Sequence, residues 1–280
     1  MTISNNPLRQ FFRQPAIYIR LPSNGNFWPA NTVDLPESGE IPVYPMTAID
    51  EITYRTPDAL FNGQATVNVI QSCVPAIRDA WGIPAVDLNA ILVAIRIASY
   101  GHEMEIATAC PACGEEAEYG LDLRTVLDRQ RSPDYSKTLD HGDLEIMFQP
   151  MSYRQQSETN NRQFEEQRIL QMLPTSDMPE EDKKQRLTQI MKAITEITVD
   201  VIKHSIAAIR TPNGMVTDTE HIGEFLINCD RQLFSIIRDH IIELKTGTEL
   251  APLTVKCTSC EHDYQQPLTL DMTSFFAPAS

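Results

Sequence analysis

Four of the six cysteines in this chain stand in two C-x-x-C pairs, an arrangement typical of metal sites. The first pair is Cys110 and Cys113, and the second pair is Cys257 and Cys260. One C-x-x-C turn presents two thiolates to a common ion, and two such turns complete a tetrahedral shell of four sulfurs. The sequence therefore predicts one structural zinc ion that is held by all four cysteines.

The residues that follow the two pairs are alike. A tyrosine comes shortly after each pair, and a Leu-x-Leu segment begins after seven intervening residues. These residues are Tyr119 with Leu121–Leu123, and Tyr264 with Leu268–Leu270. The shared spacing predicts two related β-hairpin knuckles that face each other, as in a zinc ribbon.

The segment between the two pairs, residues 114–256, is far longer than the interval of a usual zinc ribbon. Three alternatives therefore stay open, namely a site formed between two chains, a redox role for either pair, and unpaired thiols. A thioredoxin-like redox role is disfavoured because neither pair opens a helix in a βαβ unit. Four thiolates leave no open position on the ion, so the expected zinc is structural rather than catalytic.

Three other residues resemble ligands or reactive groups by type. His262 follows the second pair and is an alternative ligand, although an exposed polar residue is the simpler interpretation. Cys73 and Cys229 lie among apolar residues at helical spacing, which predicts that both are small buried side chains.

The sequence contains none of the common catalytic or nucleotide-binding motifs that we considered. The chain has no phosphate-binding loop, dinucleotide fingerprint, serine nucleophile elbow or His-Glu-x-x-His motif. Asp239 and His240 are expected to be ordinary helix residues, and the acidic run 180–182 suits the positive end of a helix dipole. A metal-dependent hydrolase would also need an open zinc position beside a base. We therefore expect a protein that is not an enzyme.

The net charge of −15 argues against a general affinity for nucleic acid, because phosphate binding needs clustered Lys and Arg. Near the cysteines, Lys256 and Arg124 are outnumbered by acidic residues. This balance disfavours the main alternative function, a zinc-ribbon accessory protein that binds nucleic acid. No apolar stretch is long enough for a membrane helix, and no signal peptide is visible, so we expect folding in a cytoplasm.

The hydrophobic pattern predicts an α+β fold that is mainly helical, with small β elements at the N-terminus and at the cysteine pairs. Strands are expected within residues 16–21, 41–45, 104–109, 143–149 and 253–256. Helices are expected to start at Thr47, Thr56, Asp87, Pro179 and Asp218, with a further helical stripe from Val67 to Val74. The helix from Pro179 is expected to carry an apolar side that reaches Ile209.

Four segments follow from this pattern. They are a polar arm (1–15), a domain with the first knuckle (16–134), a strand plus helical insert (135–250) and the second knuckle (251–280). The insert begins and ends at the metal site, so it should project from a base that zinc holds together. Residues 153–168 favour a helix that is polar on every face, and such a helix is exposed or contacts a partner. This helix and the arm are the hypothesised contact surfaces.

The N-terminal half resembles a known family. The run Tyr18–Trp28, which contains Leu-Pro-Ser-Asn-Gly, is similar to the strand-and-turn opening of T-even-like phage baseplate proteins. Further similar runs keep the family's order across residues 16–123. They are Val43–Glu51, Val69–Cys73, Leu92–Gly101 and Cys110–Gly114.

This resemblance implies a structural or assembly component of the baseplate hub of a contractile-tailed bacteriophage. It also implies that the partners are other baseplate and tail hub proteins, with a homo-oligomer as a further option, and that the location is the tail baseplate of the virion. A permanent hub subunit and a chaperone that leaves after assembly are both compatible with the resemblance.

Overall fold

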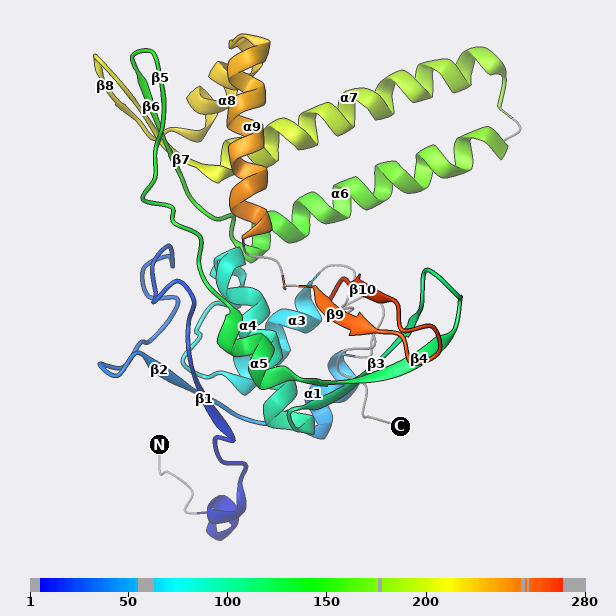
Figure 1. Ribbon diagram of the computed structural model, residues 1–280. Coiled ribbons are helices and arrows are strands. Elements are labelled where there is room, and N and C mark those ends of the chain that lie inside the picture. Colours follow the sequence, from blue (N-terminus) through cyan, green and yellow to red (C-terminus); the bar gives the residue numbers. More distant parts are fainter. Residues whose placement is uncertain (1–5, 55–62, 176–177, 248–249, 251, 269–280) are drawn as a thin grey trace.

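The computed structural model describes residues 6–54, 63–175, 178–247, 250 and 252–268. The chain forms a lower lobe that contains the N-terminal elements and an upper lobe that carries a long helix pair (Figure 1). The α+β class, mainly helical with small sheets, is confirmed. The helix predicted to begin at Thr56 lies outside the described residues. Within the described part of the chain, no helix has both the length and the apolar character needed to cross a bilayer.

The lower lobe is built around one buried helix. This helix, α4 (Ala85–Tyr100), is apolar almost all round and buries a continuous run from Ala90 to Arg96, which is typical of a central helix. The elements around it are the antiparallel strands β1 (Ile17–Arg20) and β2 (Glu40–Val43) and the helices α1 (Ala48–Tyr54), α3 (Gln64–Cys73) and α5 (Leu123–Arg129). Short 3-10 turns are formed by Pro7–Phe11 and Ala80–Gly82.

Two predicted helix caps have different outcomes. Thr47 and Asp50 cap α1 as predicted, because the hydroxyl of Thr47 accepts from the Asp50 N–H while the Asp50 carboxylate accepts from the Thr47 N–H. The prediction that Asp87 caps α4 is wrong, since α4 begins at Ala85 and Asp87 is fully buried in its first turn. The Asp87 carboxylate instead accepts hydrogen bonds from another segment of the chain.

That segment is the turn after β1. The carboxylate of Asp87 accepts from the Ser23 N–H at 2.8 Å, from the Ser23 hydroxyl at 2.5 Å and from the Trp28 indole N–H at 2.7 Å. Burial raises the pKa of Asp87, and the hydrogen bonds from Ser23 and Trp28 lower it. The turn itself has Gly25 at φ +83°, a conformation that glycine adopts without strain. The Leu-Pro-Ser-Asn-Gly run thus owes its fixed shape to a buried carboxylate.

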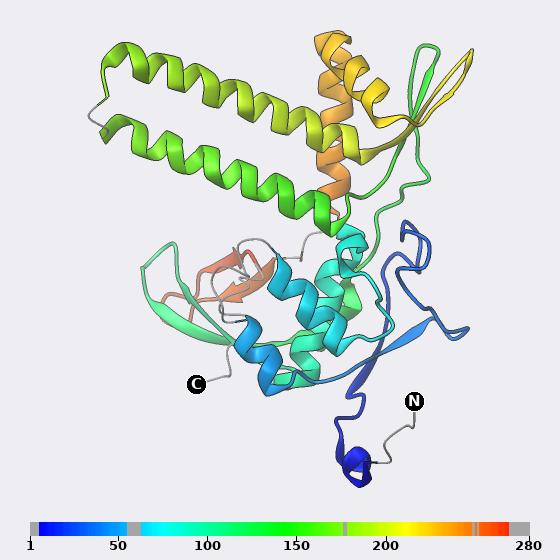
Figure 2. The ribbon, with the colours of Figure 1, turned by 180° about the vertical axis from the view of Figure 1, so that it is seen from behind.

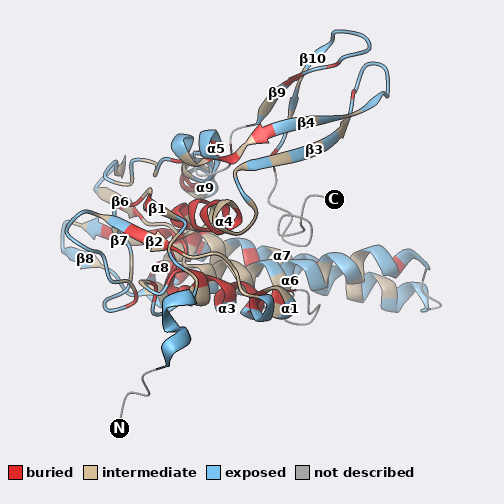
Figure 3. Cartoon of the chain, turned by 90° about the horizontal axis from the view of Figure 1, so that it is seen from below, coloured by how far each residue is buried: buried red, intermediate tan, exposed pale blue. Residues whose placement is uncertain are grey.

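Two β-hairpins extend from the lower lobe side by side (Figures 1 and 3). The first consists of β3 (Glu103–Ala109) and β4 (Glu116–Asp122), and the second of β9 (Leu253–Lys256) and β10 (Asp263–Gln266). Residues 250 and 268, which flank the second hairpin, pack into the hydrophobic core of the lower lobe. The C-terminal segment therefore returns to the lobe that contains the first hairpin.

The upper lobe contains an antiparallel sheet of order β5-β6-β7-β8. Its strands are β5 (Leu139–His141), β6 (Leu144–Phe148), β7 (Ile206–Thr211) and β8 (Gly214–Val216). The sheet packs on α8 (Thr219–Asn228) and α9 (Arg231–Thr246), and these elements share a second hydrophobic core.

Two helix boundaries in the upper lobe correct the sequence prediction. The helix from Pro179 ends at Ser205, and Ile209 lies in β7, where it pairs with Ile146 of the neighbouring strand. The single helical region predicted from Asp218 is two helices. Asp218 caps the first as predicted, and Asp230 caps the second by accepting from two backbone N–H groups.

The helix pair α6 (Tyr153–Met172) and α7 (Glu180–Ser205) projects from the upper lobe as an antiparallel hairpin, seen from both sides in Figures 1 and 2. A 3-10 turn, Leu173–Thr175, follows α6. No residue of α6 is buried, so the prediction of an exposed polar helix is confirmed. Figure 3 shows both helices largely in the colours of exposed and half-buried residues.

Candidate metal centre

The two hairpins bring all four paired cysteines together within one chain. Cys110 and Cys113 stand in the turn between β3 and β4, and Cys257 and Cys260 stand in the turn between β9 and β10. Their four Sγ atoms lie within 4.8 Å of one another, and no other such group of His, Cys, Asp or Glu occurs among residues with a described structure. The predicted meeting of the two pairs is therefore confirmed.

The separations between the sulfurs fit a tetrahedral zinc shell. The Sγ atoms of Cys110 and Cys260 are 3.7 Å apart, as are those of Cys113 and Cys257. A tetrahedron with a Zn–S distance of about 2.3 Å has sulfurs about 3.8 Å apart. Each short separation joins one hairpin to the other, so an ion held here would bridge segments that are distant in the sequence.

The two cysteine turns have the same backbone hydrogen bonds. In the first turn, the Cys110 N–H donates to the Glu115 carbonyl at 2.9 Å and the Gly114 N–H donates to the Cys110 carbonyl at 2.8 Å. In the second turn, Cys257 donates to the His262 carbonyl at 2.9 Å and accepts from Glu261 at 3.0 Å. The sequence similarity between the two knuckles thus extends to their conformation.

Backbone N–H groups point at the sulfurs and stabilise negative charge. The N–H groups of Cys260 and Ser259 lower the pKa of Cys257 to about 7. For Cys113, the Glu115 N–H lowers the pKa, but the Cys260 thiol, burial and the thiols of Cys257 and Cys110 together outweigh it and raise the pKa to about 12. Four thiols this close cannot all ionise unless a cation is present, and a divalent metal ion removes that conflict.

Polar contacts between the hairpins support the cluster. The Tyr119 hydroxyl donates to the Lys256 carbonyl at 3.2 Å, and the Thr108 hydroxyl donates to the Gln266 side-chain oxygen at 2.6 Å. Val255, Leu121 and Leu268 are buried. The second leucine of the repeated Leu-x-Leu pattern, Leu270, lies outside the described residues.

The structure also shows where the other candidate ligand, His262, and the other two cysteines lie. The His262 side chain is exposed and its ring stacks near that of Tyr264, so it does not join the sulfur cluster. Cys73 is fully buried as predicted, and burial raises its pKa to about 12. Cys229 is only half-buried, at the C-terminal end of α8, and burial raises the pKa of its thiol as well.

Acidic residues dominate the exposed side of the hairpins. Along β3 and β4, half-buried and exposed residues alternate. Met104, Ile106 and Tyr119 occupy half-buried positions, and most of the exposed positions carry carboxylates. The exposed acids are Glu103, Glu105, Glu115, Glu116, Glu118, Glu261 and Asp263. Of the two nearby basic residues, Lys256 pairs with Glu261 and Arg124 pairs with Asp122. This surface would repel a nucleic-acid backbone.

Equivalent positions of the two turns have the same left-handed backbone conformation but carry different side chains. Gly114 has φ +74° and Glu261 has φ +58°, and only glycine adopts this left-handed region without strain. The sequence signals the first position by its glycine and gives no signal for the second. The strain at residue 261 is therefore a property of the fold and not of the local sequence.

This difference predicts opposite results for two single substitutions. Glu261→Gly should raise the unfolding free energy by about 0.5–1 kcal/mol, because relief of strain exceeds the added freedom of the unfolded chain. Gly114→Ala should lower it by about 1 kcal/mol, although a Cβ there would meet no atom within 4 Å. Thermal unfolding of the zinc-loaded variants measures both changes. A loss of stability in both variants would contradict the left-handed geometry at residue 261.

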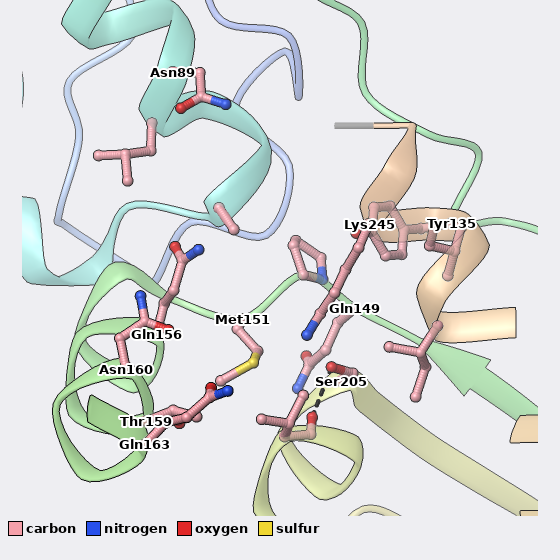
Figure 4. Close-up of a pocket in the computed structure, with 16 residues that line it drawn as sticks. Asn89, Tyr135, Gln149, Met151, Gln156, Thr159, Asn160, Gln163, Ser205 and Lys245 are labelled. Atoms are coloured by element: carbon pink, nitrogen blue, oxygen red, sulfur yellow. Dashed lines mark hydrogen bonds between the residues drawn. The ribbon is translucent and has the colours of Figure 1, made fainter. Parts of the chain in front are cut away.

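A second candidate site is a cavity of about 250 Å³ between the two lobes (Figure 4). It lies among α4, α6, α7 and α9, and side-chain amides of Asn89, Gln149 and Gln156 line it with Lys245. Burial lowers the pKa of Lys245. In the cavity, the hydroxyl of Ser205 donates to the Val201 carbonyl at 2.8 Å.

The Asp239–His240 pair lies elsewhere on α9. The centroid of the His240 ring is 4.5 Å from that of the Phe148 ring, and this packing is in line with an ordinary helix residue.

Comparison with known proteins identifies a family. A family model described as "T4 bacteriophage base plate protein" matches residues 30–277, which include both cysteine pairs. No curated protein and no solved structure matches the chain.

Proposed function

Because the chain belongs to the T4 bacteriophage base plate protein family, we propose that it is a non-enzymatic structural or assembly component of the baseplate hub of a contractile tail. The observation that carries this proposal is the family match, which spans nearly the whole chain. Its partners are other baseplate and tail hub proteins, and its location is the tail baseplate of the virion.

We further propose that Cys110, Cys113, Cys257 and Cys260 bind one structural Zn²⁺ ion. The sulfur separations of 3.7 Å and the N–H groups directed at the sulfurs support this assignment. A shell of four thiolates is closed, so the ion would supply folding free energy and no chemistry on a substrate. It would fix the second hairpin against the first and thereby the position of the upper lobe, which lies between them in the sequence.

The exposed helix pair is consistent with a role in assembly. The α6–α7 hairpin is far longer than the upper lobe needs for its own core, since no residue of α6 is buried. Apolar side chains nevertheless remain exposed on it, namely Phe164, Met172, Met178, Leu187 and Met191. Such a projecting surface suits contact with a neighbouring subunit.

Mass spectrometry of two purified samples tests the proposed function. The samples are mature tails, and hub complexes taken from infected cells before tails are complete. We expect the chain in the hub complexes. Its presence in mature tails as well would identify a permanent subunit, and its loss from them would identify an assembly factor that leaves. Absence from both samples would contradict a hub function.

A further inference from the structure

The N-terminal arm, residues 6–13, presents apolar side chains to solvent. The Asn6 side chain caps the 3-10 turn Pro7–Phe11 by accepting from the Leu8 N–H. Leu8 is 62% exposed, Phe11 is 75% exposed and Phe12 is 54% exposed. The predicted polar arm is therefore not polar throughout. Three large exposed apolar groups in one short segment indicate an interaction site, because burying them would be favourable.

Arg13 holds the base of this arm against the lower lobe. Its guanidinium donates to the Ser72 carbonyl at 2.7 Å, to the Ser72 hydroxyl at 2.9 Å and to the Pro45 carbonyl at 2.5 Å. Residues 6–12 extend away from the lobe at the lower end of the molecule (Figures 1 and 2). The arm is thus anchored at one point and free along the rest of its described length.

The charge of the arm is opposite to that of the whole chain. Residues 1–33 contain no Asp or Glu, although the net charge of the protein is −15. Arg9 is exposed, and it forms no ion pair with any residue whose structure is described. The arm is therefore a cationic and apolar segment, and its partner should be an apolar groove with an acidic rim.

A groove of this kind lies between α7 and α8 at the upper end of the molecule. It has a volume of about 720 Å³, within the range of about 300–1,000 Å³ typical of ligand pockets. The two helices approach closely at Gly223, where a Cβ would meet the Lys203 side chain at 2.9 Å. Val199 and Ile227 line the groove, and Ile227 is 71% exposed.

Carboxylates outnumber ammonium groups around this groove. Four acids, Glu196, Asp200, Glu220 and Glu224, face two lysines. Lys203 lies between Asp200 and Glu220 at 3.4 and 3.2 Å, and Lys192 lies 3.8 Å from Glu196. In the described part of the chain, Glu224 has no ion pair, which leaves it available to a cation such as Arg9.

We propose that the N-terminal arm of one copy binds in the α7–α8 groove of a second copy. The arm and the groove lie at opposite ends of the molecule (Figures 1 and 2), so an arm anchored by Arg13 is directed away from its own groove. The contact is therefore head-to-tail, and repetition of it closes a ring or extends a filament. This goes beyond the proposed function, because it concerns the purified chain alone.

Two full-length variants test the proposal by sedimentation velocity. Phe11→Asp removes the arm contact and leaves the groove intact, and Ile227→Asp does the reverse. Both residues are exposed, so folding should be unchanged, which zinc content and thermal unfolding verify. We expect the wild type to associate with rising concentration and each variant alone to associate at least about 30-fold more weakly.

The mixture of the two variants gives the decisive result. An equimolar mixture should form a heterodimer and nothing larger, because one intact arm meets one intact groove and the other pair is disabled. A monomeric wild type would overturn the proposal. The proposal would also be overturned if the wild type associated but the mixture formed no heterodimer. That result would show that the copies meet through a symmetric interface or through another surface. Either failure leaves the presence of the chain in hub complexes, and hence the proposed function, unaffected.

A charge reversal provides an independent measurement. Arg9→Glu and Glu224→Arg should each weaken self-association, and the chain carrying both changes should recover it, since the arm and the groove then exchange signs. Failure of the double variant to recover would contradict the placement of Arg9 on the acidic rim.

Discussion

Replacing Cys257 by serine should reduce bound zinc from about one ion per chain to almost none, and lower the melting temperature by on the order of 10 °C. Cys257 is buried, and its sulfur lies 3.7 Å from that of Cys113 on the other hairpin. Its loss opens the shell and removes the link between two hairpins that have little apolar core of their own. Metal analysis of reductively purified protein, with thermal unfolding of the same sample, measures both effects.

Cys229→Ser is the matched control for this experiment. Cys229 is a half-buried thiol outside the sulfur cluster, so the variant should keep its zinc. Chelation of the wild type should make four further thiols reactive, and chelation of the Cys257→Ser variant should make none. Zinc at the wild-type level in the Cys257→Ser variant would contradict a four-cysteine site.

Asp87→Asn should lower the unfolding free energy by about 2–4 kcal/mol, the largest loss we expect from an isosteric substitution in this chain. The carboxylate accepts three hydrogen bonds from Ser23 and Trp28 and has no solvent contact. An amide would place its NH2 group opposite the Trp28 indole N–H or the Ser23 N–H, and two donors would then face each other. Urea unfolding measures the loss, and Trp28 fluorescence should report the disturbed turn.

Asp34→Asn is the corresponding control. Asp34 is an exposed carboxylate that pairs with Arg78, so the same chemical change should alter the unfolding free energy by less than about 1 kcal/mol. Equal effects of the two substitutions would mean that the buried hydrogen bonds of Asp87 add nothing beyond an ordinary surface pair.

The composition of the metal site could be predicted from local spacing, because a C-x-x-C turn is a local structure. The meeting of the two pairs within one chain could not be predicted, because it depends on how the lobe between them folds. The strained Glu261 could not be predicted either, as its conformation copies that of Gly114 in the other knuckle. The N–H groups directed at the sulfurs follow from that shared turn.

For the fold, the regular strands beside the cysteines were predictable and two kinds of feature were not. The buried Asp87 bonds to a turn 64 positions earlier in the chain, so its place at the start of a helix suggested a cap. Ile209 fits the helical period of the preceding residues, but pairing with β6 places it in a strand. The start of α6 at Tyr153 was predicted from the helix-favouring composition of residues 153–168, and the capping box of Ser152 and Gln155 is a further signal of it in the sequence.

The distance between the cysteine pairs also determines when the site can close during synthesis. Cys257 stands 144 positions after Cys113, so the ribosome reaches it roughly 7–30 s later at ordinary rates of translation. The first thiol pair is therefore made well before its partners, and the whole upper lobe is synthesised in between. A chain that stops early keeps an open knuckle with unprotected thiols. The completed sulfur cluster thus distinguishes a chain that has been made as far as Cys260 from a shorter one.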